Sequence, residues 1–428
     1  MSRSVSRLVR LAVCVCVGVP ILAVAQQPAA QPEPGQPITL RFAIEQSLAR
    51  NPELQGFDYR LRAQEGRITI AGLDPPFELR GELENLGGSG NTTGFDGAEA
   101  TFSLSRVIEL GGKRQHRLDA ARATLDVVDI ERQAAQLDVV AEVTRRFIHV
   151  AADQERLALT RRATELAQET LDAARRRVEA ARAPDAELHR ANATLARARI
   201  EEEHAEHELL ASRRKLTAMW GVTRDSGLGA AAGNLYSLPQ VPEFDHLVAS
   251  IDASPDFLRF ASEARLRDAE IRVAQSRARA DVTLNAGVRR LEATDEQAFV
   301  LGASIPLFAR SRAQGAISEA RALRSLTDAE LAARRVRVEA QLFEIYQELR
   351  HAVTEEEVLR NTVLPAMDAA LRNTELAFER GRYGYLEWVD AQRELIDVQR
   401  ARIDAATNAH LALTEIERLT GAPLPGTP

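Results

Sequence analysis

Residues 77–84 read Phe-Glu-Leu-Arg-Gly-Glu-Leu-Glu, a stretch in which apolar and polar side chains alternate almost perfectly. A period of two residues is typical of a β-strand with one apolar and one polar face. The same alternation returns three more times along the chain. We expect four strands, at about 77–86, 98–107, 281–290 and 297–306. Each is close to the length of a membrane-spanning strand, which is about 9 to 11 residues.

These four strands are too few to cross a membrane on their own. In lipid every backbone hydrogen bond must be satisfied, so strands span a bilayer only as a closed barrel. Such barrels have at least about 8 strands. Several copies of the chain must therefore share one barrel if the strands enter a membrane. Alternation alone leaves a second interpretation open, in which two ordinary hairpins lie with one face on a soluble core.

Very long stretches without helix-breaking residues separate the strands. From Gly112 to about Ala181 there is no proline and no further glycine, so a single helix there would be roughly 100 Å long at ~1.5 Å per residue. We expect four long helices, at about 112–181, 185–220, 311–379 and 386–420. Pro365 should kink or restart the third of them. No compact globular core needs rods of this length.

The two halves of the chain resemble each other at an offset of 200 residues. Residues 216–221 lie over 416–421, and residues 191–195 lie over 391–395. We infer that one unit has been duplicated. The predicted parts are a first repeat at 39–221, a connecting segment at 222–242, a second repeat at 243–421 and a tail at 422–428.

The returning helix of each repeat carries a stripe at alternating steps of three and four residues, as in the seam of a left-handed coiled coil. The first stripe is Leu188, Ala191, Leu195, Ala198, Glu202, Ala205, Leu209, Ser212, Leu216 and Met219. The second is Trp388, Ala391, Leu395, Val398, Arg402, Ala405, Ala409, Ala412, Ile416 and Leu419. Both stripes break at the same place, at Glu202 and Arg402. Either both charges are solvated at a seam edge, or they form an interhelical ion pair that fixes the register.

The N-terminal residues have the pattern of a secretory signal peptide at 1–25. Three arginines precede an apolar run at 11–25 that ends in Ala-Val-Ala. This run is shorter than the roughly 20 residues that a membrane-spanning helix needs. Both cysteines lie inside it, so the mature chain should hold no thiol. Residues 26–38, rich in proline and glutamine, should form a flexible lead.

Composition and motifs argue against two functional classes. The chain has a net charge of −7 over 428 residues, with acidic and basic residues mixed throughout. It therefore lacks the clustered basic face of a nucleic-acid-binding protein. We find no catalytic triad, phosphate loop, zinc-ligand spacing or mature cysteine nucleophile, so we expect no catalytic residue and no cofactor. His204 and His207, one turn apart among carboxylates, are weak metal candidates. Both fall off the apolar seam, which favours a solvated outward face instead.

Four motifs resemble those of the TolC-like outer-membrane efflux family. Residues 81–85, Gly-Glu-Leu-Glu-Asn, and residues 105–114, Ser-Arg-Val-Ile-Glu-Leu-Gly-Gly-Lys-Arg, resemble the strand and strand-exit motifs of its cobalt-zinc-cadmium resistance branch. Residues 378–382, Phe-Glu-Arg-Gly-Arg, and residues 390–393, Asp-Ala-Gln-Arg, resemble the family's turn and returning helix. The resemblance covers essentially the whole mature chain.

The resemblance implies a mainly α fold with a small β-barrel part. A homotrimer would join four strands per chain into one transmembrane barrel in outer-membrane lipid, above a long coiled-coil helical tube in the periplasm. The implied partners are a periplasmic adaptor (membrane fusion) protein and a resistance-nodulation-division pump of the inner membrane. The chain itself would be a passive duct for divalent heavy-metal cations. Three alternatives remain: a duct for organic drugs or other small molecules, a structural coiled-coil surface protein, and a periplasmic enzyme, for which we find no acid or base cluster.

The resemblance also implies where the duct closes. Family members close the periplasmic end with acidic residues just above the hairpin tip, and the alignment at Ala391 puts Glu387 and Asp390 there, on one helical face. A ring of carboxylates would attract cations. Carboxylates at a helix start also suit the helix dipole without any gate. Asp185 and Glu187 are weaker candidates in the first repeat.

Contacts with the adaptor are expected at the two hairpin tips. The candidates are Arg380, Gly381 and Arg382 in the second repeat, and Arg182 in the first. The first tip departs from the family pattern, because Ala181 stands where the second has a turn glycine. Adaptor contact there is accordingly a weaker expectation.

Overall fold

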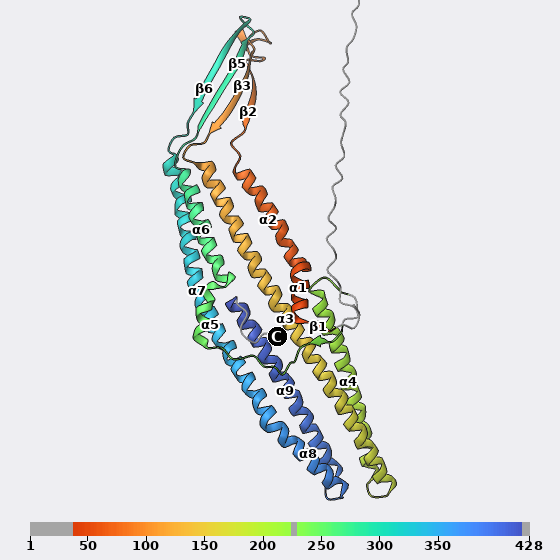
Figure 1. Cartoon of the computed structure of the whole chain (residues 1–428). Helices are drawn as coiled ribbons and strands as arrows, with labels where there is room; N and C mark the ends of the chain where they lie inside the picture. Colours follow the sequence, from red (N-terminus) through yellow and green to blue (C-terminus); the bar gives the residue numbers. More distant parts are fainter. Residues whose placement is uncertain (1–36, 224–228, 422–428) are drawn as a thin grey trace, which may run out of the picture.

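The computed structural model describes residues 37–223 and 229–421. The predicted signal peptide at 1–25, nearly all of the lead at 26–38 and the tail at 422–428 lie outside these residues. Long helices run side by side through most of the molecule, and a β-sheet extends from one end (Figure 1). In the part that is described, none of the helices combines the length and apolarity needed to cross a bilayer.

The order of elements is similar in the two halves. The first half contains β1 (Ile38–Thr39), α1 (Leu40–Arg50), α2 (Pro52–Ala71), β2 (Phe77–Glu84), β3 (Glu99–Ile108), α3 (Lys113–Glu179) and α4 (Asp185–Ala218). The second contains β4 (Ala231–Ala232), α5 (Phe244–Ser250), α6 (Pro255–Ser276), β5 (Val282–Leu291), β6 (Glu296–Ser304), α7 (Ala309–Val358), α8 (Leu364–Glu379) and α9 (Tyr385–Thr420). In each half a helix, a strand pair, a long helix and a returning helix follow in turn.

Helices α2 and α6 begin in the same way. Pro52 and Pro255 stand in the first turn, where proline is favoured because its fixed φ suits the helix and its missing N–H would have no partner there. The side chain of Asn51 caps α2 by accepting hydrogen bonds from the N–H groups of Glu53 and Leu54.

Helices α7 and α8 are joined by a π-helical segment at Leu359–Val363, where the sequence predicts a kink or restart. Pro365 has no N–H for the carbonyl of residue 361, and its ring clashes with that carbonyl in a regular α-helix. A wider π-helical turn accommodates such a break. The helix therefore continues through the proline position with an altered hydrogen-bond pattern.

The main sheet is antiparallel, with the strand order β2-β3-β5-β6. Directly opposed residues share a face, so the register collects the large apolar side chains on one side. That apolar face contains Phe77, Leu79, Leu83, Phe102, Leu104, Leu284, Val288, Phe299 and Leu301. The opposite face contains Glu78, Glu82, Glu84, Glu99, Thr101, Ser103, Ser105, Asn285 and Arg289. Within the described chain β2 and β6 each have one edge without a partner strand.

The apolar face of the sheet is bare. Phe299 is 90% exposed and Leu301 is 81% exposed. These values contradict the interpretation in which the hairpins lie with their apolar face on a soluble core of the same chain. The polar face is the more enclosed one, because Thr101 and Ser103 are buried.

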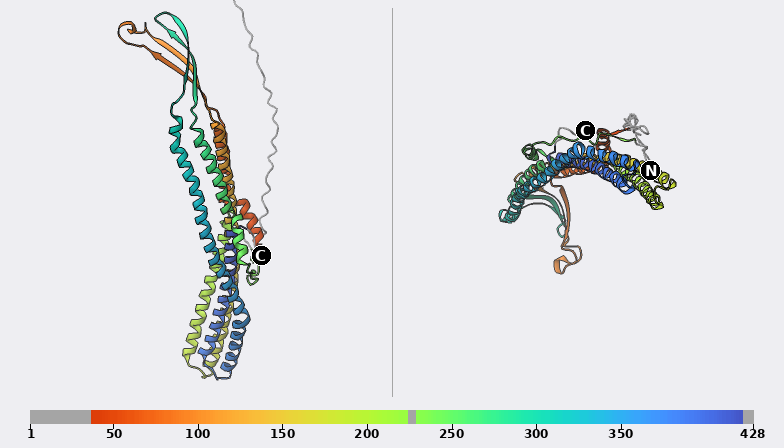
Figure 2. Two further views of the ribbon diagram at one scale, coloured as in Figure 1. Left: turned by 90° about the vertical axis from the view of Figure 1, so that its left-hand side faces the viewer. Right: turned by 90° about the horizontal axis from the view of Figure 1, so that it is seen from below.

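The helices form a single curved layer, which Figure 2 shows from below. Nearer the sheet, neighbouring helices are α2, α3, α6 and α7; farther away they are α4, α3, α9 and α7 with α8. Helices α1 and α5 lie on the convex side of the layer, and the strands bend towards the concave side (Figure 2). The layer thus ends at α2 and α4 on one side and at α7 and α8 on the other.

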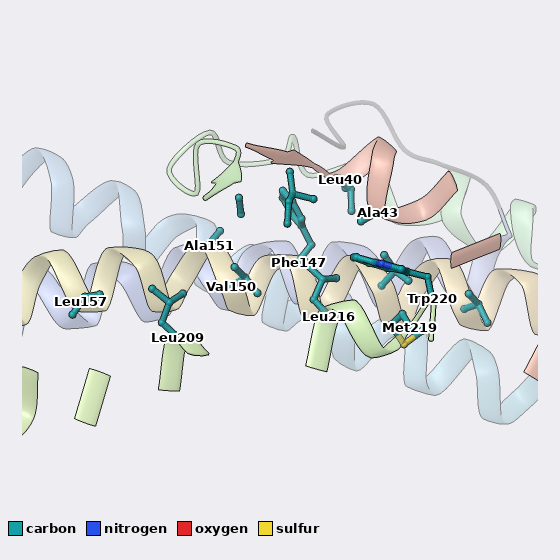
Figure 3. Packing of buried hydrophobic residues seen from close by; sticks show 14 of the residues in the cluster. Leu40, Ala43, Phe147, Val150, Ala151, Leu157, Leu209, Leu216, Met219 and Trp220 are labelled. Atoms are coloured by element: carbon teal, nitrogen blue, oxygen red, sulfur yellow. The ribbon is translucent and has the colours of Figure 1, made fainter. Parts of the chain in front are cut away.

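A core on the convex side fixes the middle of the layer. Leu40 and Ala43 of α1 pack with Phe147 of α3 and with Trp220 after α4 (Figure 3). Ile38, at the end of the predicted flexible lead, is buried and pairs with Ala231.

We call residues 229–243 the strap, because they cross the convex side between α4 and α5. Ala231 exchanges two hydrogen bonds with the Gln154 side chain of α3, donating its N–H at 2.6 Å and accepting from the amide at 3.3 Å. Farther along, Nε2 of His410 donates to the carbonyl oxygen of Leu235 at 2.9 Å. Burial lowers the pKa of His410, which favours its neutral ring.

Candidate functional site

Two grooves open on the concave face. The first, of about 400 Å³, is lined by Arg146, His149, Asp153 and Arg156 of α3 and by Glu208, Ala211, Ser212 and Lys215 of α4. The second, of about 470 Å³, is lined by Ile345, Glu348, His351, Ala352 and Glu355 of α7 and by Asn408, Leu411, Ala412 and Glu415 of α9.

The strap lies on the other side of the helices from both grooves. Phe147 and Gln154 of α3 contact strap residues, and His410 of α9 does the same. At about 100° per residue, His149 and Ala412 each lie roughly 200° around the helix from Phe147 and His410 respectively. The grooves therefore face the concave side, opposite the strap.

The grooves occupy equivalent positions in the two halves of the chain but differ in charge. The α4 residues of the first groove and the α9 residues of the second match at an offset of 200. The first groove has three cationic side chains and two carboxylates, whereas the second has three carboxylates and only His351 as a basic group. The charge along the concave face thus changes from one half to the other.

Glu387 and Asp390 lie in the same row as the α9 residues of the second groove, where a row is a set of residues at heptad spacing along one face of the helix. Both are exposed in the first turns of α9, three heptads before Asn408 and Leu411. Residues a whole number of heptads apart share a face in a coiled coil, so the two carboxylates belong to the concave side close to the tip.

The same row contains further carboxylates that the sequence analysis did not single out. They are Glu394, Asp397, Asp404 and Glu415. Asp404 pairs with Arg156 at 2.7 Å and Glu415 pairs with Arg145 at 3.1 Å. Heptad numbering carried on from Glu387 and Asp390 would have found them. We call the whole set, from Glu387 to Glu415, the acidic row.

The carboxylates of the first repeat are divided between two rows. Glu187 stands three heptads before Glu208 and belongs to the first groove's row. Its Oε2 is buried without a hydrogen-bond partner. Asp185 stands three heptads before Glu206, whose carboxylate pairs with Arg161 at 2.8 Å. Asp185 is therefore off the groove.

The hairpin tips share one backbone conformation. In each, a residue at positive φ follows the helix, Ala181 at +52° and Gly381 at +71°. The N–H groups of Arg182 and Arg382 each reach back five residues to a carbonyl, both at 2.8 Å, the Schellman arrangement. The sequence difference at this position therefore leaves the turn unchanged. Arg182, Arg380 and Arg382 are all exposed at the tips.

An aromatic cluster joins the two hairpins near their tips. The rings of Phe378 and Trp388 stack at 4.6 Å between centroids, and the guanidinium of Arg177 lies 4.4 Å from the Phe378 ring. Just above, the hydroxyl of Thr170 donates to the side-chain oxygen of Gln392 at 3.1 Å. The sequence identifies Trp388 as a seam residue and Phe378 and Gln392 as parts of motifs, but it does not predict these contacts.

The two seam breaks form interhelical ion pairs, each within its own half. Glu202 lies 3.7 Å from Arg161 of α3, and Arg402 lies 3.0 Å from Glu356 of α7. Glu356 is fully buried, so this second pair is sheltered from water. Glu202 and Arg402 do not pair with each other.

Arg402 also holds the strap in place. Its guanidinium lies 4.1 Å from the ring of Tyr236. The hydroxyl of Tyr236 donates to Glu155 at 3.3 Å. Burial, together with the nearby negative charge of Glu155, raises the pKa of Tyr236 to about 12. Tyr236 therefore remains a neutral hydrogen-bond donor at physiological pH.

His204 and His207 lie three residues apart on α4, and their side chains are 67% and 70% exposed. His204 pairs with Glu208 at 3.3 Å, in the row of the first groove. His207 pairs with Glu203 at 3.7 Å, also on α4. Across residues 37–223 and 229–421, no group of three or more His, Cys, Asp or Glu side chains is placed to hold a metal ion.

Known proteins resemble this chain along nearly its whole length. It is 29% identical over 389 residues to the cobalt-zinc-cadmium resistance protein CzcC of Cupriavidus metallidurans, covering 91% of each chain. It is 26% identical over 316 residues to the nickel-cobalt-cadmium resistance protein NccC of Alcaligenes xylosoxydans xylosoxydans, covering 73% of this chain and 70% of that one.

Solved structures share the fold. A crystal structure of CusC superposes with a TM-score of 0.76 at 15% identity, covering 93% of this chain and 96% of that one. A membrane protein from Pseudomonas aeruginosa gives a TM-score of 0.74 at 19% identity, covering 91% of each chain. The sequence pattern of the family named outer membrane efflux protein matches residues 43–222 and 247–422. The chain thus belongs to the outer membrane efflux protein family, and its place is the bacterial outer membrane, from which it extends into the periplasm.

Proposed function

We propose that three copies of this chain form the passive outer-membrane duct of a tripartite export system, with divalent heavy-metal cations as cargo. The observation that carries this proposal is that both the sheet and the helical layer have unpaired edges, on the same two sides of the chain. Among the residues that the structure describes, the sheet has two edges without a partner strand, and the curved helical layer has two edges without a partner helix.

Closure of the sheet requires other copies. The apolar face is exposed and the polar face is the more enclosed one, which is the polarity of a barrel wall with lipid outside and water inside. A barrel in lipid has no free edge. Pairing β6 of one copy with β2 of the next satisfies both edges, and three copies exceed the minimum of about 8 strands.

Closure of the helical layer also requires neighbouring copies, because both of its edge helices have exposed apolar residues. Exposed residues on the free side of α7 are apolar at heptad spacing: Ala322, Leu326, Ala329, Ala333, Val336 and Ala340. Exposed residues on α2 continue the pattern at the opposite edge, with one more just after the helix: Tyr59, Ala63, Gly66 and Ile70, then Leu73. Val336 is 71% exposed and Tyr59 is 69% exposed. Such stripes are the half-seams of coiled coils, and a neighbouring copy would cover them.

An internal duplication supports the ring. The family's pattern matches the chain twice, once in each half, and the two concave grooves correspond at an offset of 200. With two similar units per chain, three copies would place six similar units around one axis. The concave face, including Glu387 and Asp390, would then line the interior.

The proposed cargo rests on charge and on the relatives. The relatives at 29% and 26% identity are named for resistance to cobalt, zinc, cadmium and nickel. The acidic row would attract cations without binding them tightly, as a conduit requires. We assign the gate to Glu387 and Asp390, with Glu187 as a weaker counterpart and Asp185 off the row.

Energy would come from partners, because a passive duct has no source of its own. The exposed tips at Arg380, Gly381 and Arg382, together with Arg182, are the proposed contacts with a periplasmic adaptor. The adaptor would connect the duct to a resistance-nodulation-division pump in the inner membrane.

A deletion strain tests the cargo. We expect sensitivity to zinc, cobalt or cadmium, restored by the wild-type gene, with no change towards a panel of organic drugs. Sensitivity to drugs alone would remove the metal assignment and favour the drug duct. Conductance of the purified oligomer in a planar bilayer tests the duct itself, and a protein that inserts but passes no current would contradict it.

A further inference from the structure

A hollow lies on the apolar face of the sheet, at the end nearest the helices. Its volume is about 730 Å³, within the range of small-molecule sites, roughly 300 to 1,000 Å³. Its lining on this face consists of Phe77, Leu104, Arg106, Ile108, Leu284, Ala286, Leu301 and Ala303. All of these belong to the same chain.

The sizes of the side chains explain the shape of this hollow. Two rows run across the strands here: Phe77, Arg106, Leu284 and Ala303 form one, and Leu79, Leu104, Ala286 and Leu301 form the other. Ala286 and Ala303 have short side chains between leucines, so the surface is hollow at the alanines and raised around them. The result is an apolar trough on the side of the sheet that faces lipid in the proposed duct.

One end of the trough is cationic. Of the described residues that line it, Arg106 alone is charged, and its guanidinium lies 4.8 Å from the ring of Phe77. Arg114, in the first turn of α3, stands nearby, because both arginines contact the carboxylate of Asp74, at 3.4 and 3.2 Å. Two cations share one anion there, which leaves a net positive charge at the boundary between strands and helices.

The arginines are available to a ligand. Their side chains are 41% and 54% exposed, and that of Asp74 is 52% exposed. Ion pairs this exposed contribute little to stability, so a phosphate can compete with Asp74. Guanidinium groups bind phosphate oxygens through paired hydrogen bonds. The surface therefore combines an elongated apolar trough with a phosphate-binding group at one end. These two features together match one class of ligand, a phospholipid.

We propose that this trough binds an anionic phospholipid of the periplasmic leaflet, with its phosphate on Arg106 and Arg114 and an acyl chain along Leu104, Ala286 and Ala303. The proposal rests on the proposed duct, since it requires the apolar face to stand in lipid. The lipid proposal goes beyond the duct by assigning a specific lipid-binding site. The lipid would fix the height of the barrel in the membrane where the helices begin.

Photo-crosslinking tests the site. The full-length oligomer is reconstituted with phosphatidylglycerol or phosphatidylcholine carrying a diazirine in the acyl chain, and labelled peptides are identified by mass. We expect phosphatidylglycerol to label residues 282–308 more strongly than phosphatidylcholine does. Arg106→Gln with Arg114→Gln should lower phosphatidylglycerol labelling about tenfold, as loss of charged hydrogen bonds implies, and leave phosphatidylcholine labelling unchanged. Ala303→Phe should fill the trough and lower both.

Arg290→Gln is the matched control. Arg290 lies on the same face at the far end of β5 and is also paired with two carboxylates, Glu292 and Asp295, so its loss should change nothing at the trough. Equal labelling by the two lipids in the wild type, or no effect of Ala303→Phe, would overturn the proposal.

Conductance of the same preparations separates this inference from the proposed duct. Oligomers that conduct but show no specific labelling remove only the lipid site. Wild-type protein that fails to conduct removes the duct. Arg114→Gln alone, outside the strands, provides a milder variant should the double variant fold poorly.

Discussion

A single alanine carries backbone strain at the first hairpin tip. Ala181 adopts φ +52° in a turn with the same backbone hydrogen bonds as the turn at Gly381. For a residue with a Cβ this left-handed conformation costs roughly 1 to 2 kcal/mol. Glycine avoids that cost but loses more chain entropy on folding. The tip turn thus depends on the flanking helices to hold Ala181 in place.

We predict that Ala181→Gly stabilises the protein by about 1 kcal/mol and that Gly381→Ala destabilises it by a similar amount. The temperature of thermal unfolding, followed by circular dichroism in detergent, measures both. Ala180→Gly is the control, because Ala180 has a negative φ of −82° and gains nothing from glycine. A lower unfolding temperature in Ala181→Gly would contradict the strain argument.

At the scale of elements, the strap couples the two halves. It is held by Gln154 and Glu155 of α3 and by Arg402 and His410 of α9. Ion pairs between α3 and α9, such as Arg156 with Asp404, lie on the other side of the layer. The contact between the halves is therefore polar on the concave side and fastened by the strap on the convex side.

The strap attachment should weaken in acid because of His410. Burial lowers its pKa below the ordinary value of 6.5, so just below pH 6.5 the unfolded chain binds more protons than the folded one. The stabilisation is complete above pH 6.5 and is lost as the pH falls from there towards the lowered pKa. We predict a smaller drop in unfolding temperature between pH 7.5 and 5 for His410→Gln than for the wild type.

Glutamine keeps a donor for the carbonyl of Leu235 and removes the titration. His351→Gln serves as the control, since the His351 side chain is 80% exposed on α7, away from the strap. An identical pH profile in the wild type and in His410→Gln would exclude His410 as the source.

At the scale of the whole molecule, the helical layer would close when a neighbouring copy covers the exposed apolar stripes on α2 and α7. Their side chains contact no other helix of the described chain on that side, and burying them would add the hydrophobic stabilisation that one copy lacks. The grooves and the acidic row would become the inner wall in the same step.

Val336→Glu should prevent assembly of the proposed trimer while leaving each chain helical. A carboxylate in a buried seam loses its hydration without gaining a partner. Size-exclusion chromatography with light scattering in detergent gives the oligomeric state. Gln341→Glu, an exposed site on another side of α7, should remain trimeric. A Val336→Glu trimer as stable as the wild type would show that this stripe is not an interface.

Neutralising the tip carboxylates should reduce cation selectivity. With Glu387→Gln and Asp390→Asn in every copy, the entrance loses six charges in a trimer of the proposed kind, and the reversal potential in a salt gradient should move towards zero. Asp185→Asn, at the same height but off the row, should have little effect. Unchanged selectivity in the double variant would place the gate elsewhere.

Local periodicity in the sequence was enough to predict the strands, the long helices and the buried seams. Phe77–Glu84 alternates with period two and the stripe from Leu188 follows a heptad, and a backbone can satisfy each pattern in only one way. The same numbering placed Glu387 and Asp390 on one helical face.

Only the tertiary structure decided which distant residues meet. The pairs of Arg402 with Glu356 and of Glu202 with Arg161, the bridge from Arg106 through Asp74 to Arg114, and the strand order β2-β3-β5-β6 join segments far apart in the chain. Periodicity fixes which way a side chain points from its own helix or strand. It carries no information about which neighbour stands opposite, because that depends on how the whole chain packs.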